Sequence, residues 1–438
     1  MTSTAPRLAR SHIDLHDELH ARPALPVRAP GVVSAWAQWG MSAEQADQAL
    51  GLLAQALGQT TPAAGTRHQV VRGPQFELKF ERHGEFVSWQ VFKALDVDHL
   101  ADTDIAEANA LDVLPPEFVA CLQAGVPMIA ATHVVLLSAD EEDLLRWRAR
   151  MTGSGEAASA SPLIGARIAD SRAVVLTRLD LGDDGFTRFV VLDFGLAPDQ
   201  AAREAQRLCE IEIYRMLAML GFPAAQQASA ALGELERGLQ RSVDAMANEA
   251  QHDDALTFHA LTRLAAEVEH AAARSRYRFA ATRAYHQIVQ SRLAELREQP
   301  LSGVQTLGGF LGRRFAPAMA FCDSTDRRLS DVADRIQRAV TLSQVRAEVQ
   351  RENTNQELLR ALAHRQQLQL RLQQTVEGLS VVAISYYALG LVGVLAKGAT
   401  AWPGVPPVSP DLVVGVATIP VVLGVLWFVR RLRRDLGA

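Results

Sequence analysis

Two long stretches without a charged residue occur near the C-terminus, at Gly378–Ala396 and Leu412–Val429. Glu377 and Lys397 bracket the first stretch, and Asp411 precedes the second. A helix needs about 20 apolar residues to cross a bilayer, so each stretch is just long enough for one crossing. The alternative is a pair of buried helices in a soluble core, but such helices usually keep a polar stripe. The pattern predicts transmembrane helices at 378–396 and 412–429.

The connection between these two helices, residues 397–411, is short, rich in proline and carries Lys397 as its one basic residue. Loops on the cytoplasmic side of a membrane are enriched in lysine and arginine. We therefore expect a bacterial inner-membrane protein with both termini in the cytoplasm, an outer loop at 397–411 and a basic tail at 430–438. The arginines that set this orientation are Arg360, Arg365 and Arg371 before the first helix, and Arg430, Arg431, Arg433 and Arg434 after the second.

Some residues within the predicted membrane helices are not explained by anchoring. Two tyrosines lie at the middle of the first helix, whereas tyrosine usually prefers the membrane interfaces. Two glycines and a lysine follow at helical spacing on the face of the first tyrosine, and a proline lies midway along the second helix. The pattern fits either close helix packing through small residues or an ion path. The residues are Tyr386, Tyr387, Gly390, Gly393, Lys397 and Pro420.

The N-terminal part, residues 1–195, has the pattern of an α/β domain. Phe76–Phe92 contains two β-rich runs around a His-Gly pair, which predicts a β-hairpin. A second hairpin is expected to turn at Gly182–Gly185. Helical patterns occur at Ala43–Leu57 and Asp140–Met151.

Residues 196–377 lack strand patterns and predict long helices. Ala201–Leu220 is amphipathic and ends at a Gly-Phe-Pro sequence, while Asp254–Glu298 runs without proline or glycine. A further run from Asp323 to Glu377 leads directly into the first membrane helix. The predicted fold is therefore an α+β cytoplasmic domain, then long α-helices, then a C-terminal two-helix transmembrane hairpin.

The last of these helices carries an imperfect coiled-coil seam. Apolar residues recur at heptad-like spacing, but the two middle positions are polar. Such a long helix cannot bury its seam alone, so it requires the preceding helix, identical copies of the chain, or both. We therefore expect a homo-oligomer. The seam consists of Leu358, Leu362, Arg365, Gln369, Leu372 and Val376.

Overall charge and cysteine content narrow the choice of partners. The net charge of −5 argues against nucleic-acid binding, which needs a basic face. Cys121, Cys209 and Cys322 are odd in number and widely spaced, which indicates reduced thiols rather than disulfides or a zinc site. The first thirty residues contain no apolar run typical of a signal peptide. Membrane lipid, a cytoplasmic protein or a small ligand are the expected partners.

The densest polar cluster is LHDELHARP, at Leu15–Pro23. If this segment is helical, His16 and His20 share a face at the spacing that a divalent metal would use, and His83 or Glu85 is a candidate third ligand. A structural cap or a docking segment is the alternative. His133, inside an apolar strand, reads as a core histidine with satisfied hydrogen bonds. No Ser-His-Asp or Cys-His arrangement stands out, and no cofactor other than a metal is expected.

A run of arginines on one predicted helix resembles a nucleic-acid face, but we interpret it as ion-paired to neighbouring helices. The glycines of Gly308–Gly312 lack the order of a phosphate-binding loop. The arginines concerned are Arg274, Arg276, Arg278 and Arg283.

Three stretches carry a family resemblance: LHDELHARP, FERHGEFVSW at Phe80–Trp89, and TVEGLSVVAISYYALGLVG at Thr375–Gly393. With them the whole chain resembles a bacterial family of uncharacterised membrane-anchored proteins, classed as a domain of unknown function. The resemblance implies no activity, cofactor or catalytic residue. The layout is also similar to that of CorA-type divalent-cation channels. Their Gly-Met-Asn-like motif after the first span is replaced here by Ala396–Thr400, which contains a lysine and no asparagine.

Three functions remain open. The first is an oligomeric membrane-tethered scaffold or sensor, whose cytoplasmic domain binds a partner or ligand. The second is an ion channel or transporter with its path along the first membrane helix. The third is a metal-dependent activity at the N-terminal histidines. An enzyme is the least favoured class, because no catalytic set is recognisable.

Overall fold

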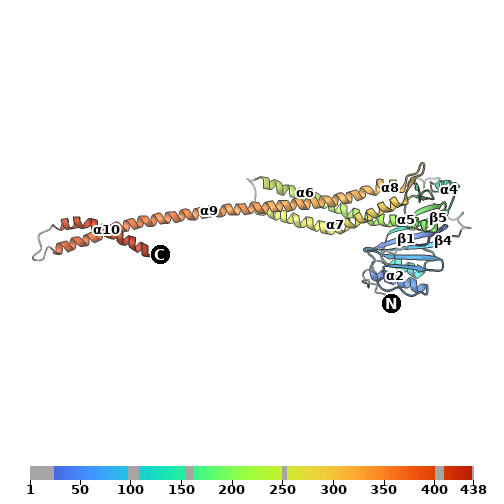
Figure 1. The fold of residues 1–438 in the computed structure, drawn as a ribbon, viewed down its shortest axis with the longest axis horizontal. Coiled ribbons are helices and arrows are strands. Elements are labelled where there is room, and N and C mark those ends of the chain that lie inside the picture. The colour runs from blue at the N-terminus through green and yellow to red at the C-terminus, as the bar shows by residue number, and fades with distance from the viewer. Residues whose placement is uncertain (1–23, 97–107, 153–160, 249–253, 400–408, 437–438) are drawn as a thin grey trace, which may run out of the picture. The chain divides into compact units, whose positions relative to one another are not determined.

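The protein's structure is a computed structural model that describes residues 24–96, 108–152, 161–248, 254–399 and 409–436. The chain divides into two compact units, Met1–Val340 and Thr341–Ala438. All the described strands belong to the first unit, and the described elements of the second are helical (Figure 1). Helix α9 (Ala316–Ala399) has residues in both units.

One mixed sheet of nine strands forms the centre of the described part of the first unit. Its order is β2-β3-β4-β1-β5-β8-β7-β6-β9; β5 and β8 are parallel, and the other pairs are antiparallel. Both hairpins that the sequence predicts are present, as β3–β4 and β7–β8. The strands are β1 (Gly31–Trp39), β2 (His68–Arg72), β3 (Phe76–Arg82), β4 (Phe86–Ala94), β5 (Met128–Ser138), β6 (Ile164–Ile168), β7 (Ala173–Thr177), β8 (Thr187–Asp193) and β9 (Gln299–Pro300).

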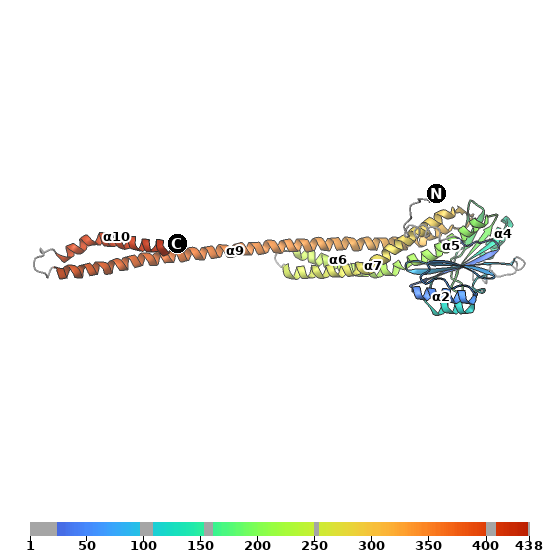
Figure 2. The ribbon, with the colours of Figure 1, turned by 60° about the horizontal axis from the view of Figure 1, so that its bottom comes forward.

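Helices cover both faces of this sheet (Figures 1 and 2). On one face α2 (Ala43–Ala56) and α3 (Pro116–Ala124) bury an aromatic-rich core, in which Trp89 is fully buried. On the other face α5 (Pro198–Met219) and α7 (Asp254–Leu296) pack over a separate core. Successive side chains of a strand point to opposite faces, so central strands such as β1 and β5 supply both cores. Helix α4 (Glu141–Thr152) follows β5 at the edge of the first core.

Helix α6 (Gly221–Ala247), helix α7 and the first part of α9 share a third apolar core. The Gly-Phe-Pro sequence does end a helix, because α5 stops at Met219, but α6 begins at once. Proline is tolerated there since the first turn of a helix has no partner for its N–H group. At Gly221 an added Cβ would lie 2.2 Å from Thr282 Oγ1, so only glycine fits between these helices. The short α8 (Leu307–Arg314) precedes α9.

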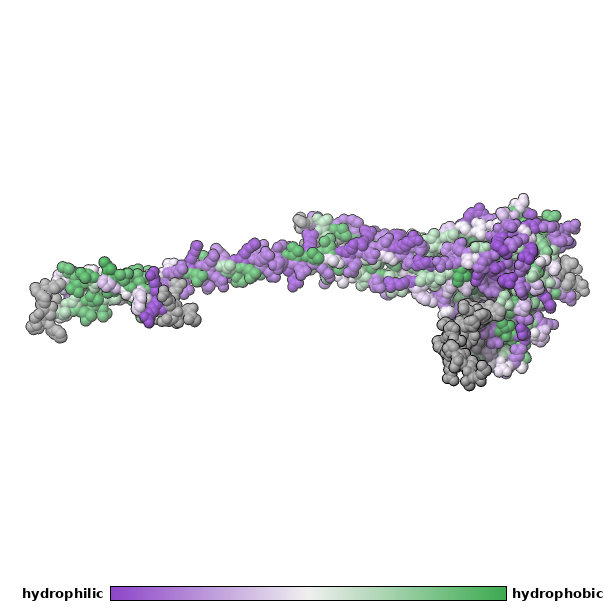
Figure 3. Space-filling view, in the orientation of Figure 1, coloured by the Kyte–Doolittle hydropathy of each residue, from purple (hydrophilic) through white to green (hydrophobic). Residues whose placement is uncertain are grey.

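The second unit contains the C-terminal part of α9 and α10 (Pro410–Leu436), which lie side by side (Figures 1 and 2). Their apolar side chains are largely uncovered, as the green surface over both helices shows (Figure 3). The preceding stretch of α9 is mostly hydrophilic (Figure 3). The predicted fold class, a mixed sheet with helices followed by long helices that end in two apolar ones, is confirmed.

Candidate functional site

His83 lies in the turn between β3 and β4, where its backbone N–H donates to the Phe86 carbonyl at 2.9 Å. Its ring stacks on the Phe86 ring with 4.1 Å between centroids, and Ser88 Oγ lies 3.4 Å from its Nε2 atom. The other two predicted metal ligands, His16 and His20, fall outside the described residues. Within the described part of the chain, no three His, Cys, Asp or Glu side chains are grouped closely enough to hold a metal ion.

The neighbouring Glu85 joins this turn to helix α7. Its carboxylate accepts hydrogen bonds from the Arg278 guanidinium and from Tyr285 Oη, each at 2.5 Å, and from Trp39 Nε1 at 3.4 Å. Burial raises the pKa of the Glu85 carboxyl, but the Arg278 and Tyr285 hydrogen bonds outweigh this effect and leave the pKa below its usual value. Burial and the same carboxylate raise the pKa of Tyr285. Glu85 is therefore an ionised anchor for the hairpin.

Two of the four arginines in the α7 run have the ion-paired role that the sequence analysis gave them. Arg278 pairs with Glu85 of the sheet. Arg283 reaches Asp323 and Asp326 of α9 at 2.9 and 3.0 Å. These pairs hold α7 against its neighbours.

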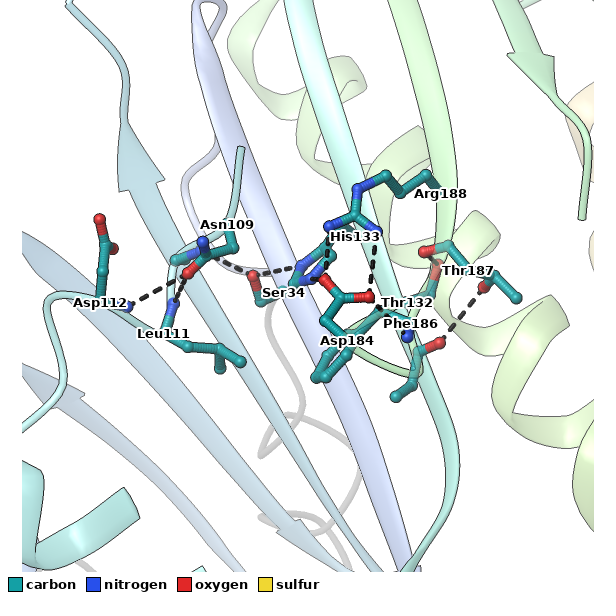
Figure 4. A network of polar contacts seen from close by, with 12 residues as sticks. Ser34, Asn109, Leu111, Asp112, Thr132, His133, Asp184, Phe186, Thr187 and Arg188 are labelled. Carbon is teal, nitrogen blue, oxygen red and sulfur yellow. Dashed lines mark hydrogen bonds and ion pairs between the residues drawn. The ribbon is translucent and has the colours of Figure 1, made fainter. Parts of the chain in front are cut away.

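A serine, a histidine and an aspartate from three distant parts of the chain form a hydrogen-bonded row (Figure 4). Ser34 Oγ of β1 lies 2.8 Å from Nδ1 of His133 on β5, whose Nε2 lies 3.3 Å from Asp184 Oδ2. Ser34 Oγ also accepts the backbone N–H of Ala110 at 2.8 Å. The aspartate in turn accepts hydrogen bonds from Arg188. The sequence did not show this row, because its members are 51 and 99 residues apart.

This row has the order of a hydrolytic triad but not its accessibility. Ser34 is fully buried and His133 is 1% exposed, so no substrate carbonyl can approach Ser34 Oγ. Burial, together with the charge of Arg188, lowers the pKa of His133 to about 4, which keeps the ring neutral. Partial burial raises the pKa of Asp184, but hydrogen bonds from Arg188 and the Phe186 N–H outweigh it and bring the value to about 2. His133 is the satisfied core histidine that the sequence predicts.

Among the described residues, two helices are long and apolar enough to cross a membrane. Their most apolar windows have mean hydropathies of 2.0 and 2.5, and only 11% and 0% of those windows are buried. A core helix of a soluble protein would be mostly buried, and these windows are not. The first candidate membrane helix lies in α9. The second is Pro410–Arg431 of α10, which continues as a helix through Pro420.

The residues that the sequence places on one face of the first membrane helix lie in two different environments: one packs against α10, and others are exposed. An added Cβ on Gly393 would lie 3.3 Å from Val414 Cγ2, so Gly393 packs against α10. Tyr386 is 74% exposed, Gly390 has no heavy atom within 4 Å of an added Cβ, and the adjacent Ser385 is only 5% exposed. Tyr387 is 73% exposed and meets Tyr386 edge to face. Helix α10 therefore covers the Ser385 side of α9 and leaves the Tyr386 side open.

A cavity lined by His83 and by residues that the sequence analysis did not single out lies beside the β3–β4 turn. It lies between one face of the sheet and helices α5 and α7, and it is partly open. Its strand residues alternate with apolar ones, which in a sequence is the signature of a solvent-facing side. No signal in the sequence marks them as buried.

A mixed sheet packed between helices, with two uncovered apolar helices at the C-terminus, defines the class to which this chain belongs: α+β proteins with candidate membrane helices. More particularly, the chain belongs to the family described as "Protein of unknown function (DUF3422)", whose family model matches residues 10–436. No curated protein matches it. A solved structure titled "structure of the full-length CmaX protein" is 12% identical, with 85% of this chain and 100% of that chain covered. Its TM-score of 0.19 does not establish a common fold.

Proposed function

We propose that this chain is a membrane-anchored, self-associating scaffold or sensor, with α9 and α10 as a transmembrane hairpin and the first unit in the cytoplasm. The anchoring is supported by two apolar helices whose most apolar windows are only 11% and 0% buried. The orientation is supported by the arginines before 378 and after 429, since basic residues favour the cytoplasmic side. Lipid is then the solvent of both apolar helices, and the inner membrane of a bacterium is the location.

The observation that carries self-association is one stripe that runs along α9 without a change of spacing. Its positions are alternately four and three residues apart, which is the heptad period of a coiled coil. All of them are exposed except Gly393, which is half-buried. The predicted seam and the predicted membrane face are therefore parts of the same stripe. It consists of Leu358, Leu362, Arg365, Gln369, Leu372, Val376, Leu379, Ala383, Tyr386, Gly390, Gly393 and Lys397.

The partner that we propose for this stripe is the same stripe of a second copy. Helix α10 occupies the adjacent side of α9, where Ser385 is buried and Val381, Leu389 and Val392 are half-buried. Apolar seam residues such as Leu372, which is 67% exposed, lack a cover within the described chain. A parallel pair of α9 helices would bury these residues outside the membrane. Within it, glycine at 390 would allow the backbones to approach closely.

Cysteine cross-linking in isolated membranes tests this proposal. It compares two exposed leucines that lie on different faces of helix α9. Leu372 lies on the stripe and Leu370 lies about 200° away around the helix, yet both are more than half exposed. Leu372→Cys is expected to give a disulfide-linked dimer under mild oxidation, and Leu370→Cys is expected to give little. The yields are compared on a non-reducing gel.

The unmodified chain is the background control, because it reports any cross-link through its own thiols, of which Cys209 and Cys322 are buried and Cys121 is half-buried. Equal yields from the two variants, or no dimer from Leu372→Cys, would show that the stripe does not face a second copy.

Ion conduction is a second candidate function, favoured by the exposure of Tyr386 and Gly390 on the open side of α9. In an oligomer these residues and Lys397 would line an axial path. Flux from reconstituted liposomes tests it: if the chain and its Lys397→Asp variant both pass no ion, the channel is excluded and the scaffold remains.

A further inference from the structure

The cavity beside His83 has a volume of about 210 Å³ and is built on the face of the sheet that α5 and α7 cover. Strand β4 contributes Ser88 and Gln90, which are 3% and 5% exposed. Helix α5 contributes Gln206 and Glu210, and α7 contributes Arg292. Hydrogen-bonding groups from three elements therefore converge on one partly open cavity, which is the kind of arrangement that holds a small ligand.

The charges around this space balance in pairs. Lys79 Nζ lies 3.3 Å from Glu81 Oε1, an ion pair without a hydrogen bond, and both side chains are buried. The Arg292 guanidinium pairs with Glu210, whose other carboxylate oxygen accepts from Gln206 Nε2 at 2.6 Å. Each cation thus has a carboxylate of its own. A ligand with net charge would leave a buried charge uncompensated, which is strongly unfavourable.

One buried amide at this cavity lacks a partner. Among the residues that the structure describes, none forms a hydrogen bond with the Gln90 side chain, although the residue is only 5% exposed. Gln38 on the neighbouring strand shows the usual situation. Its amide donates to the carbonyls of Leu122 and Val126, and it accepts from Trp89 Nε1. Buried amides in proteins are normally bonded in this way, so the Gln90 amide points to a group that the cavity receives.

Size and shape limit that group. At about 30 Å³ per water molecule, the cavity has room for roughly seven waters. Aromatic rings form one side of it, since Phe86 and Tyr214 meet at 90° with 5.9 Å between their centroids. The space therefore offers an apolar surface beside acceptors and donors of hydrogen bonds.

We propose that this cavity binds a small uncharged polyol of monosaccharide size, held by Gln90, Ser88 and the free carboxylate positions of Glu81 and Glu210. Hydroxyl groups both donate and accept, so they suit an amide, a serine and carboxylates together. Carbon-bound hydrogens of the same molecule suit the aromatic side of the cavity. An anion would meet the two carboxylates, and a bare cation would find no group of three ligands among the described side chains.

This cavity would be the ligand site of the proposed sensor, so its role in the cell rests on that proposed function. Its test is separate, because ligand binding is read by thermal stability and self-association by cross-linking. If Leu372→Cys gave no dimer but a polyol raised the Tm, self-association would be rejected and the ligand site would stand. If the dimer formed but no polyol raised the Tm, only the ligand site would be rejected.

Thermal unfolding of the full chain in detergent, followed by tryptophan fluorescence, is measured with glucose, galactose, mannose, myo-inositol and glycerol. At about one hundred times its Kd, a bound polyol is expected to raise the Tm by roughly 5 °C. Gln90→Leu is expected to abolish the rise. Without polyol its Tm should be equal to or higher than that of the unchanged chain, because the unpaired amide is gone.

Two further variants complete the experiment. Ser88→Ala, a small change that should not disturb folding, is expected to weaken the response. Gln240→Leu, at an exposed glutamine of α6, is expected to respond like the unchanged chain. The proposal is overturned if no polyol raises the Tm of the unchanged chain, or if the rise persists in Gln90→Leu and Ser88→Ala.

Discussion

His133 is a titratable side chain that the sheet keeps neutral. It is held between Ser34 and Asp184 and stacks on Phe186 with 4.2 Å between ring centroids. Its pKa falls from 6.5 to about 4, chiefly because burial disfavours the charged ring, and the Arg188 charge adds to this effect. Asp184 acts in the opposite direction without reversing the shift.

The free energy of unfolding should therefore depend on pH through this residue. Below pH 6.5 the unfolded chain binds a proton at His133, whereas the folded chain does so only near pH 4. Its stabilising contribution is complete above 6.5 and is lost as the pH falls to about 4, by about 3 kcal/mol. Urea unfolding in detergent at several pH values, followed by tryptophan fluorescence, measures the loss.

His133→Gln provides the control, since glutamine does not titrate. The pH dependence of the unchanged chain minus that of this variant isolates the histidine from the carboxyl groups that also titrate in acid. If the free energy of unfolding fell by the same amount in both proteins between pH 6.5 and 4, the inference that folding keeps His133 neutral would be wrong.

At the scale of elements, the Glu85 anchor joins the β3–β4 hairpin to α7. Arg278 and Glu85 are 14% and 11% exposed, so their contact is protected from water. Removing one member of such a pair leaves the other charge buried without a partner. Tyr285 would lose its acceptor as well.

Glu85→Ala should lower the free energy of unfolding by roughly 2–4 kcal/mol. Glu267→Ala is the matched control, because Glu267 pairs with Arg263 at 3.5 Å on the exposed surface of α7. That pair is worth about 0.5 kcal/mol or less. Denaturant unfolding measures the free energy of unfolding of both variants. Decreases of similar size would argue against an anchoring role for Glu85.

Local pattern predicted some elements and could not predict others. The β3–β4 hairpin was predicted because its turn signal and its strands are adjacent in sequence. Strand β1 was not, since it is buried on both faces between β4 and β5 and shows no alternation. Strand β9 pairs with β6 over a long sequence distance, which a local pattern cannot reveal.

The cavity lay beyond prediction for a different reason. In β3, Phe76, Leu78 and Phe80 alternate with charged residues, which normally indicates a strand with one side in water. Lys79 and Glu81 are instead 2% and 6% exposed, because α5 and α7 cover that side. Which helices return over a sheet is decided by packing across the whole domain. Only the histidine at 83 was singled out from sequence, and as a metal ligand rather than as a cavity residue.

At the scale of the molecule, the boundary after Val340 separates a unit whose described residues form three apolar cores from a unit whose described helices are largely exposed. A chain that ends at Val340 should therefore be recovered in the soluble fraction after lysis. A chain that ends at Ala399 keeps the first apolar window and should stay with the membranes under alkaline carbonate. Fractionation and blotting measure both. Soluble behaviour of the longer chain would contradict a membrane helix in α9.

The unbroken course of α9 through Ala399 has a consequence for helical phase. Every side chain after a given point is fixed in direction by the number of residues before it, at about 100° each. One residue inserted between Gln369 and Leu372 would turn Tyr386 and Gly390 away from the line of Leu358 and Leu362. Seven inserted residues would restore it. The number of residues between the hydrophilic part of this helix and its apolar end thus fixes the angle between their side chains, without any contact between the two parts.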